Sequence, residues 1–210
     1  PAFGHPRRRM SQITLPLDWP ETGDPTGFIV DESNADAVRH LDSWGLWPVH
    51  ITLLTGPRKS GRSTLAKLFA RKSGGQVIDD ADLSEEEALF HAWNAAQATQ
   101  TPLLIVADEP PPRWEIALPD LQTRIAATPK VRIEEPSDRL IEARFQHHFS
   151  GRGLAMPQNV IDYLLKRMDR SHAALAHMIE LLDRQAYEQG RRITVNLARE
   201  VMAEIGFIDL

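Results

Sequence analysis

The chain has 210 residues, 42% of them hydrophobic, which is enough to bury one sizeable core with a small second module. Its 24 basic and 29 acidic residues are interspersed and give a net charge of −5, so no wide basic field is available to hold nucleic acid by its phosphates. With no cysteine and no apolar run long enough to span a bilayer, disulfides and membrane spans are excluded, and we expect a cytoplasmic protein.

The amino-terminal segment divides into two parts. Residues 1–10 combine Pro, Gly and Arg without periodicity and predict a disordered tail ahead of the core. Residues 11–18 contain Gln12, then Leu15, Pro16 and Leu17, and the proline favours an extended backbone. Such a peptide can place its leucines in an apolar groove of a partner while the Gln12 amide fixes the register. A bare Gln-x-x-Leu pattern is weak, and an ordinary amino-terminal strand is the alternative.

The rest of the chain alternates apolar runs with helical patterns and then becomes helical throughout. Short strand-like runs occur at 49–55, 76–79, 103–107 and 130–134. After Pro136, helical patterns follow at 138–148, 157–168, 171–189 and 194–205. Between the second and third strands, Ser84 and Glu87 form a capping-box pattern at a helix start. The sequence predicts an α/β core with a parallel sheet over residues 19–136 and a helical lid over 137–210.

A phosphate-binding loop follows the first predicted strand. The run Gly56-Pro57-Arg58-Lys59-Ser60-Gly61-Arg62-Ser63-Thr64 lies between that strand and a helix, which is the context of a P-loop. Glycines let backbone N–H groups surround phosphate oxygens, and the Ser63 hydroxyl can reach Mg²⁺. Arg62 stands where the usual loop has Lys, and its bulkier planar group need not reach the same oxygens. A glycine-rich turn that simply opens a helix is the alternative.

Two strands end in paired carboxylates that could serve the metal. Asp79 and Asp80 follow the second strand, whereas Asp108 and Glu109 follow the third. By pattern the second pair is the better match. By order along the fold, however, a sensor strand must come after the acid strand, so we assign Asp79 to Mg²⁺ and Asp80 to polarising the attacking water.

These motifs resemble those of the AAA+ proteins related to Hda and DnaA. The stretch 101–111 is similar to the family's sensor 1 strand and Pro-rich loop, and Leu118-Pro119-Asp120-Leu121-Gln122-Thr123-Arg124 is similar to its box VII. Met156-Pro157, residues 163–170 and 181–184 resemble the Hda lid. The similarity runs from about residue 11 to the end, and an arginine at the position of Arg62 also occurs among Hda proteins.

The resemblance implies roles for several residues. Phe28 and Val30 match a box that flanks adenine, and Asp108 matches sensor 1. Arg124 matches an arginine finger that reaches a neighbouring subunit's nucleotide; an ordinary surface arginine is the alternative. The peptide at Gln12 resembles the motif by which Hda proteins bind the DNA polymerase III sliding clamp, the β subunit. Implied ligands and partners are ADP or ATP with Mg²⁺, DnaA, the clamp and, in some form, a homo-oligomer.

Two departures from the family pattern bear on the chain's own activity. Only the fifteen residues 64–78 separate Ser63 from Asp79, too few for the usual helix, strand and helix, so we expect four strands with the usual second strand missing. Ala173 stands where relatives place the sensor 2 arginine. Together with Arg62, this loss predicts slow or absent ATP hydrolysis by the isolated protein.

Three functions from different classes remain. The first is a clamp-bound regulator that promotes hydrolysis of DnaA-bound ATP and so restrains replication initiation. The second is an autonomous P-loop ATPase or another nucleotide-binding adaptor, favoured by Ser63, Asp79 and Asp80 but opposed by Arg62 and Ala173. The third, a DNA-binding initiator fragment, requires a helix-turn-helix domain beyond the lid, which this sequence does not contain.

Overall fold

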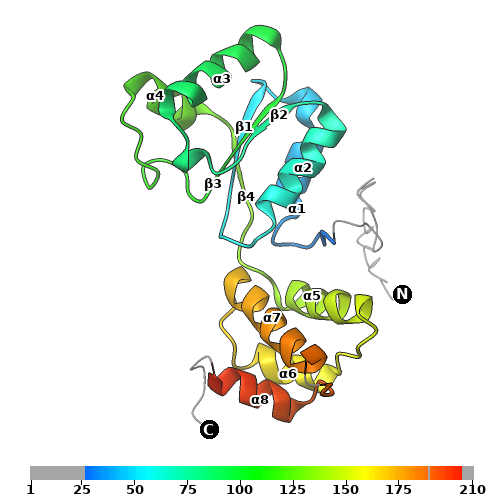
Figure 1. Cartoon of the computed structure of the whole chain (residues 1–210). Coiled ribbons are helices and arrows are strands. Elements are labelled where there is room, and N and C mark those ends of the chain that lie inside the picture. Colours follow the sequence, from blue (N-terminus) through cyan, green and yellow to red (C-terminus); the bar gives the residue numbers. More distant parts are fainter. Residues whose placement is uncertain (1–26, 189, 205–210) are drawn as a thin grey trace, which may run out of the picture.

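In the computed structural model, residues 27–188 and 190–204 are described, so the predicted segments 1–10 and 11–18 lie outside the described residues. The chain forms an α/β lobe and, beyond it, a cluster of helices (Figure 1). The strands are β1 (Ile51–Thr55), β2 (Gln76–Ile78), β3 (Leu103–Ala107) and β4 (Lys130–Arg132). The helices of the α/β lobe are α1 (Ala35–Asp42), α2 (Arg62–Ser73), α3 (Glu86–Thr99) and α4 (Pro119–Ala127), with short 3₁₀ turns at Trp44–Leu46 and Ala81–Leu83.

The four strands form one parallel sheet in the order β2-β3-β1-β4. This confirms the four-stranded parallel sheet expected from the spacing. The two central strands are buried along their whole length, which explains their continuous apolar runs. The two edge strands have three residues each and are partly exposed, and β2, which precedes Asp79, is one of them.

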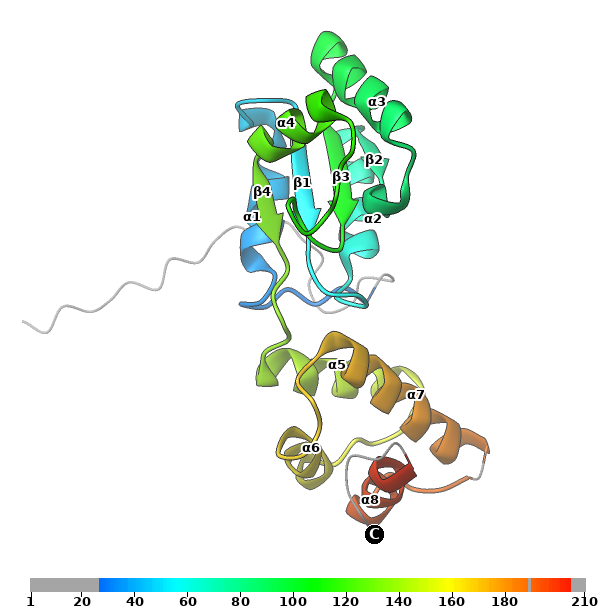
Figure 2. The same cartoon turned by 90° about the vertical axis from the view of Figure 1, so that its left-hand side faces the viewer.

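Helices cover both faces of the sheet because side chains along each strand alternate in direction. Leu54, Leu104 and Val106 face the core shared with α1 and α2. Leu53 and Ile105 face the opposite core, shared with α3 and α4. Figure 1 shows α3 and α4 on one side of the sheet and α1 and α2 on the other; in Figure 2 the side with α3 and α4 faces the viewer. Because all four strands run parallel, their carboxyl ends lie at the same edge of the sheet.

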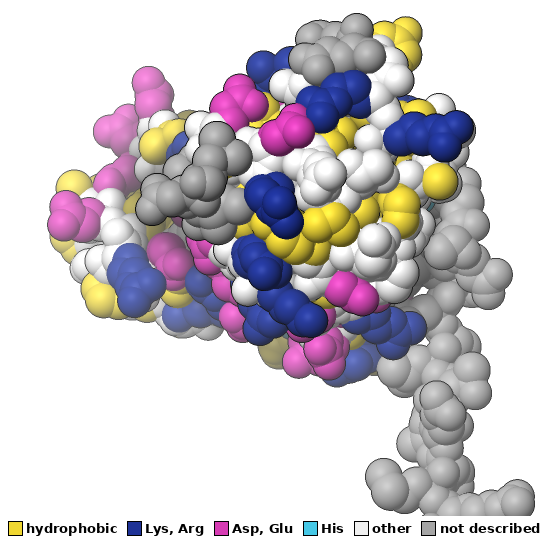
Figure 3. Space-filling view, turned by 90° about the horizontal axis from the view of Figure 1, so that it is seen from below, with side chains coloured by type: hydrophobic (Ala, Val, Ile, Leu, Met, Phe, Trp, Pro, Cys, Tyr) yellow, Lys and Arg dark blue, Asp and Glu magenta, His cyan; other side chains and the backbone are white. Residues whose placement is uncertain are grey.

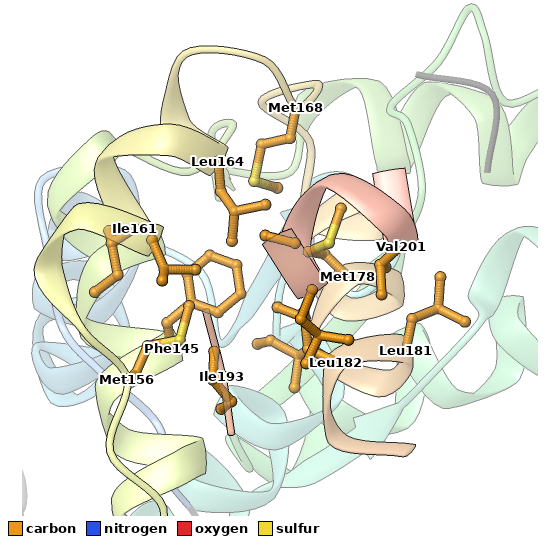
Figure 4. Packing of buried hydrophobic residues seen from close by; sticks show 14 of the residues in the cluster. Phe145, Met156, Ile161, Leu164, Met168, Met178, Leu181, Leu182, Ile193 and Val201 are labelled. Atoms are coloured by element: carbon orange, nitrogen blue, oxygen red, sulfur yellow. The ribbon is translucent and has the colours of Figure 1, made fainter. Parts of the chain in front are cut away.

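The lid consists of α5 (Asp138–Gly151), α6 (Gln158–Leu165), α7 (His172–Glu188) and α8 (Val195–Glu204), and it confirms the predicted helical lid. Their apolar stripes meet in a separate core, in which Phe145, Leu164, Met178 and Leu182 point toward one another (Figure 4). Ser137 begins α5 by accepting a hydrogen bond from the Leu140 N–H at 3.0 Å. None of the helices that the structure describes is both long and apolar enough to cross a membrane.

One local prediction was wrong. Ser84 does not cap α3, because that helix begins two residues later, at Glu86, after a 3₁₀ turn. The Ser84 hydroxyl instead donates to the Asp80 carbonyl at 3.3 Å. Glu86 accepts from the backbone N–H groups of Ala117 and Leu118 at 2.8 and 2.7 Å, and so joins the start of α3 to the segment that opens α4.

Candidate functional site

The predicted phosphate loop connects β1 to α2 at the carboxyl edge of the sheet. Gly56 must be glycine because a Cβ there would lie 2.7 Å from the Ile133 carbonyl oxygen. Gly61 has a φ of +94° and precedes the first residue of α2, while the ring of Phe28 lies close enough to be 3.0 Å from a Cβ at Gly61. The loop therefore has the backbone of a phosphate-binding turn, with Phe28 packed against it.

Two buried donors in this loop have no hydrogen-bond partner within the described part of the chain. They are the Ser60 hydroxyl and Nη1 of Arg62. A buried polar group without a partner is unfavourable by about 1–3 kcal/mol, and more for a charged group, unless a ligand or water satisfies it. Both donors lie where the P-loop pattern places phosphate oxygens. The residues present thus fit a nucleotide phosphate.

Asp108, at the end of β3, binds two arginines of the phosphate loop. Its carboxylate accepts from Arg58 Nε at 2.9 Å and from Nη2 of Arg62. Burial favours a higher pKa for Asp108, but the hydrogen bonds from Arg58 and Arg62 outweigh it and hold the pKa below the ordinary value of 3.8. The acid is therefore ionised at neutral pH and compensates the charge of Arg62, whose side chain is only 10% exposed.

The predicted metal residues lie in a more open environment. Ser63, Asp79 and Asp80 are all exposed, and Asp80 adopts a positive φ of 49°. Across the described residues, no group of three or more His, Asp or Glu side chains is arranged to hold a metal ion. A Mg²⁺ ion bound here would therefore depend on nucleotide oxygens and water for most of its ligands.

A cavity separates the phosphate loop from the lid. Its walls are formed by Gly27, Phe28, Ile29, Asn34, Lys59, Ser60, Gly61, Thr64, Leu140, Arg144, His172, Leu175 and Ala176. Its volume of about 40 Å³ holds roughly three water molecules, since each needs about 10–15 Å³. A group bound in it would contact both the phosphate loop and the lid.

The two predicted base-flanking residues take different positions. Both Phe28 and Val30 pack against the core beneath α1 and α2, but of the two only Phe28 also lines the cavity, where Ile29 lies beside it. Asn34 shapes this segment by donating from Nδ2 to the Ile29 carbonyl at 2.9 Å. The sequence interpretation therefore identified the segment but missed Ile29. In an extended segment neighbouring side chains point to opposite sides, so choosing Phe28 gave no reason to choose Ile29 as well.

Hydrogen bonds join the lid to the α/β lobe beside the cavity. Ser137 donates to Asp31 at 2.5 Å, and Nε2 of His172 lies 2.9 Å from the Glu134 carbonyl oxygen. A carbonyl can only accept, so Nε2 of His172 carries the proton. Burial lowers the pKa of His172, and its ring is therefore neutral at neutral pH.

Arg124, the predicted finger, lies on α4 away from the phosphate loop. Its guanidinium carbon is 4.6 Å from the ring centroid of Trp93 and 4.9 Å from that of Phe90, both on α3. Within the described residues it has no acidic partner, and its side chain is partly exposed. The guanidinium lies over both rings in a cation–π arrangement and donates no hydrogen bond to another described residue, so its N–H donors are free for a ligand.

Comparisons with known proteins agree with this arrangement. Residues 138–202 match the family model described as the Hda lid domain. The structure is similar to domain III of the Thermotoga maritima replication initiation protein DnaA, with 15% identity over 88% of this chain and 96% of that chain and a TM-score of 0.71. It is also similar to AMPPCP-bound DnaA from Aquifex aeolicus (18% identity, 79% and 67% covered, TM-score 0.61) and to the Thermotoga maritima RuvB Holliday junction branch migration motor (12%, 82% and 68%, 0.60).

Proposed function

We propose that this chain, an AAA+ protein related to Hda and DnaA, binds DnaA beside the sliding clamp and promotes hydrolysis of the ATP that DnaA holds. It would thereby restrain replication initiation in the cytoplasm. One observation carries the proposal. Arg124 is a partly exposed cation that lies over the rings of Phe90 and Trp93 and has no acidic partner among residues 27–188 and 190–204.

The setting of Arg124 suits a finger that acts on another subunit. Long side chains usually lose considerable rotamer entropy when they bind, but two aromatic rings already restrict this one. Its in-plane donors remain available for a γ-phosphate, where a guanidinium can neutralise charge that develops as the bond to the leaving group breaks. Such a residue acts through a partner's nucleotide and needs no hydrolysis at the chain's own loop.

The chain's own loop would bind ADP or ATP without efficient turnover. Lys59, Ser60 and Arg62 would hold phosphates, Phe28 would pack near the base, and Ser63 with Asp79 would hold Mg²⁺ through water. Asp108 compensates Arg62, which leaves less positive charge for a γ-phosphate than a free lysine would supply. Asp80 would polarise the attacking water, Asp108 would take the sensor 1 position, and slow hydrolysis is the expected result.

Binding to the sliding clamp is proposed from the sequence alone. The peptide with Gln12, Leu15, Pro16 and Leu17 lies outside the described residues, and its support is the pattern of a glutamine followed by apolar anchors. The face seen in Figure 3 gives no reason to add DNA as a direct partner. On the face shown in Figure 3, basic and acidic side chains are interspersed around a band of hydrophobic ones.

The decisive experiment replaces Arg124 and measures clamp-dependent hydrolysis of DnaA-bound ATP. We expect Arg124→Ala to reduce the stimulation by about 10³-fold or more, the range known for arginine fingers. Arg124→Lys should not restore it, because an ammonium lacks the planar fork. Gln122→Ala, at an exposed position of the same helix, is the matched control. If Arg124→Ala melts normally and stimulates hydrolysis like the wild type, the finger assignment is wrong.

A further inference from the structure

Arg144 on α5 lines the cavity between the phosphate loop and the lid. It forms no hydrogen bond or ion pair with any other described residue, and burial alone lowers the pKa of its guanidinium. A desolvated cation without a partner is unfavourable for folding. Most arginines of the lid avoid this situation; Arg152 and Arg170, for example, are paired with Asp183 and Asp138. Arg144 therefore differs from these neighbours in being partly buried without an ion pair or hydrogen bond to another described residue.

The walls of the cavity show what kind of ligand would compensate Arg144. Among the residues that line it, Lys59 and Arg144 are cationic and none is acidic. His172 also lines it, and its ring is neutral for the reason given above. The cavity therefore attracts an anion. Opposite Arg144 lies the phosphate loop, where the Ser60 hydroxyl and Nη1 of Arg62 have no partner within the described chain.

The lid would otherwise offer such an anion no charge. The amino-terminal part of α7 contributes His172, Leu175 and Ala176 to the cavity, and none of the three carries a positive charge there. A neutral imidazole and apolar side chains cannot balance a phosphate. The only lid cation in the cavity wall comes instead from α5, since Leu140 and Arg144, four residues apart, share one face of that helix.

We propose that Arg144 binds a phosphate of a nucleoside diphosphate or triphosphate held in this cavity, and so supplies from α5 the lid cation that α7 lacks. The inference rests on the nucleotide binding in the proposed function but not on its DnaA-directed activity. Arg144 closes the site from the lid side while the phosphate loop encloses the same group from the core side. A guanidinium suits this position because it can donate two parallel hydrogen bonds to phosphate oxygens.

Calorimetric titration of the full chain with ADP tests this role. We expect Arg144→Gln to weaken ADP binding about ten- to a hundredfold, the loss of one charge-assisted contact, and Arg144→Lys to weaken it less. Arg139→Gln is the matched control, since Arg139 is an exposed arginine of the same helix. Adenosine binding should be equal in the wild type and Arg144→Gln, because adenosine has no phosphate.

Thermal melting without nucleotide separates binding from a structural role. Arg144 is partly buried and has no partner in the described part of the chain, so Arg144→Gln should melt at the temperature of the wild type or higher, whereas loss of a packing arginine would lower it. The proposal is overturned if Arg144→Gln binds ADP like the wild type, if adenosine binding falls equally, or if the wild type binds no ADP. Stimulation of DnaA by Arg124 is measured separately, so either proposal can fail alone.

Discussion

Replacing Asp108 by Asn tests whether this acid compensates the arginine of the phosphate loop. The substitution keeps the size of the side chain but removes its charge. Asp108 accepts from Arg58 and Arg62, and Arg62 has no other acidic partner among the described residues. Because the Arg62 side chain is only 10% exposed, its charge cannot be screened well by water once the carboxylate is gone. We expect Asp108→Asn to lower the free energy of unfolding.

The two contacts contribute unequally to this loss. Arg58 is 71% exposed and contributes little, because solvent screens it. Breaking a fully buried ion pair costs about 3–5 kcal/mol, but Asp108 is itself 33% exposed, so we discount the Arg62 contact to about 2 kcal/mol. For a chain of this length about 1 kcal/mol shifts the melting temperature by about 2–4 °C, which predicts a decrease of about 4–8 °C.

Thermal melting across a pH series is the assay, and Arg58→Gln is the control that removes only the exposed contact. The pKa of Asp108 is lowered in the folded state, so its stabilisation is complete above 3.8 and is lost as the pH falls through the folded-state pKa. The difference between the wild type and Asp108→Asn should therefore be full at neutral pH and shrink in acid. Equal melting temperatures at neutral pH would refute the reasoning.

Two further predictions concern the partners. Trp93→Leu keeps an apolar side chain on α3 but removes the ring beneath Arg124. It should reduce the stimulation of DnaA ATP hydrolysis about 2- to 30-fold, the value of one cation–π contact. Undiminished stimulation would show that the ring does not position Arg124. Changing Gln12 and Leu15 together to Ala should abolish binding to the sliding clamp, measured by surface plasmon resonance, and leave the melting temperature unchanged, because the peptide precedes the core. Unaltered clamp affinity would remove the peptide from the proposal.

The fold could be predicted from the sequence where residue patterns reflect burial directly. The runs at 51–55 and 103–107 are buried on both faces, and such strands appear as continuous apolar segments. The expectation of four strands, without the usual second strand, followed from chain length alone, since residues 64–78 cannot hold a helix, a strand and another helix. The capping box at Ser84 was wrong because a pattern of four residues does not reveal a competing 3₁₀ turn just before it.

The candidate site was predictable in position but not in charge pairing. The glycines located the loop, yet the bonds from Arg58 and Arg62 to Asp108 span 50 and 46 residues and depend on β1 lying beside β3. Arg144 gave no signal at all, since a single arginine in an amphipathic helix ordinarily faces solvent. Only the packing of α5 over the phosphate loop distinguishes it from Arg139.

Arg62, Arg144 and Arg124 differ in whether an acidic side chain balances their charge, and this difference favours action on a partner's nucleotide over hydrolysis at the chain's own loop. At that loop Arg62 is neutralised by Asp108, and Asp80 is exposed after a short edge strand, so neither is well placed to stabilise charge that develops in a transition state. Arg144 lines the cavity and has no ion pair within the described part of the chain, which suits holding a phosphate there. Arg124 lies on α4 outside this cavity, is partly exposed and has no acidic partner among the described residues, so of these three arginines it is the one open to a nucleotide on another protein.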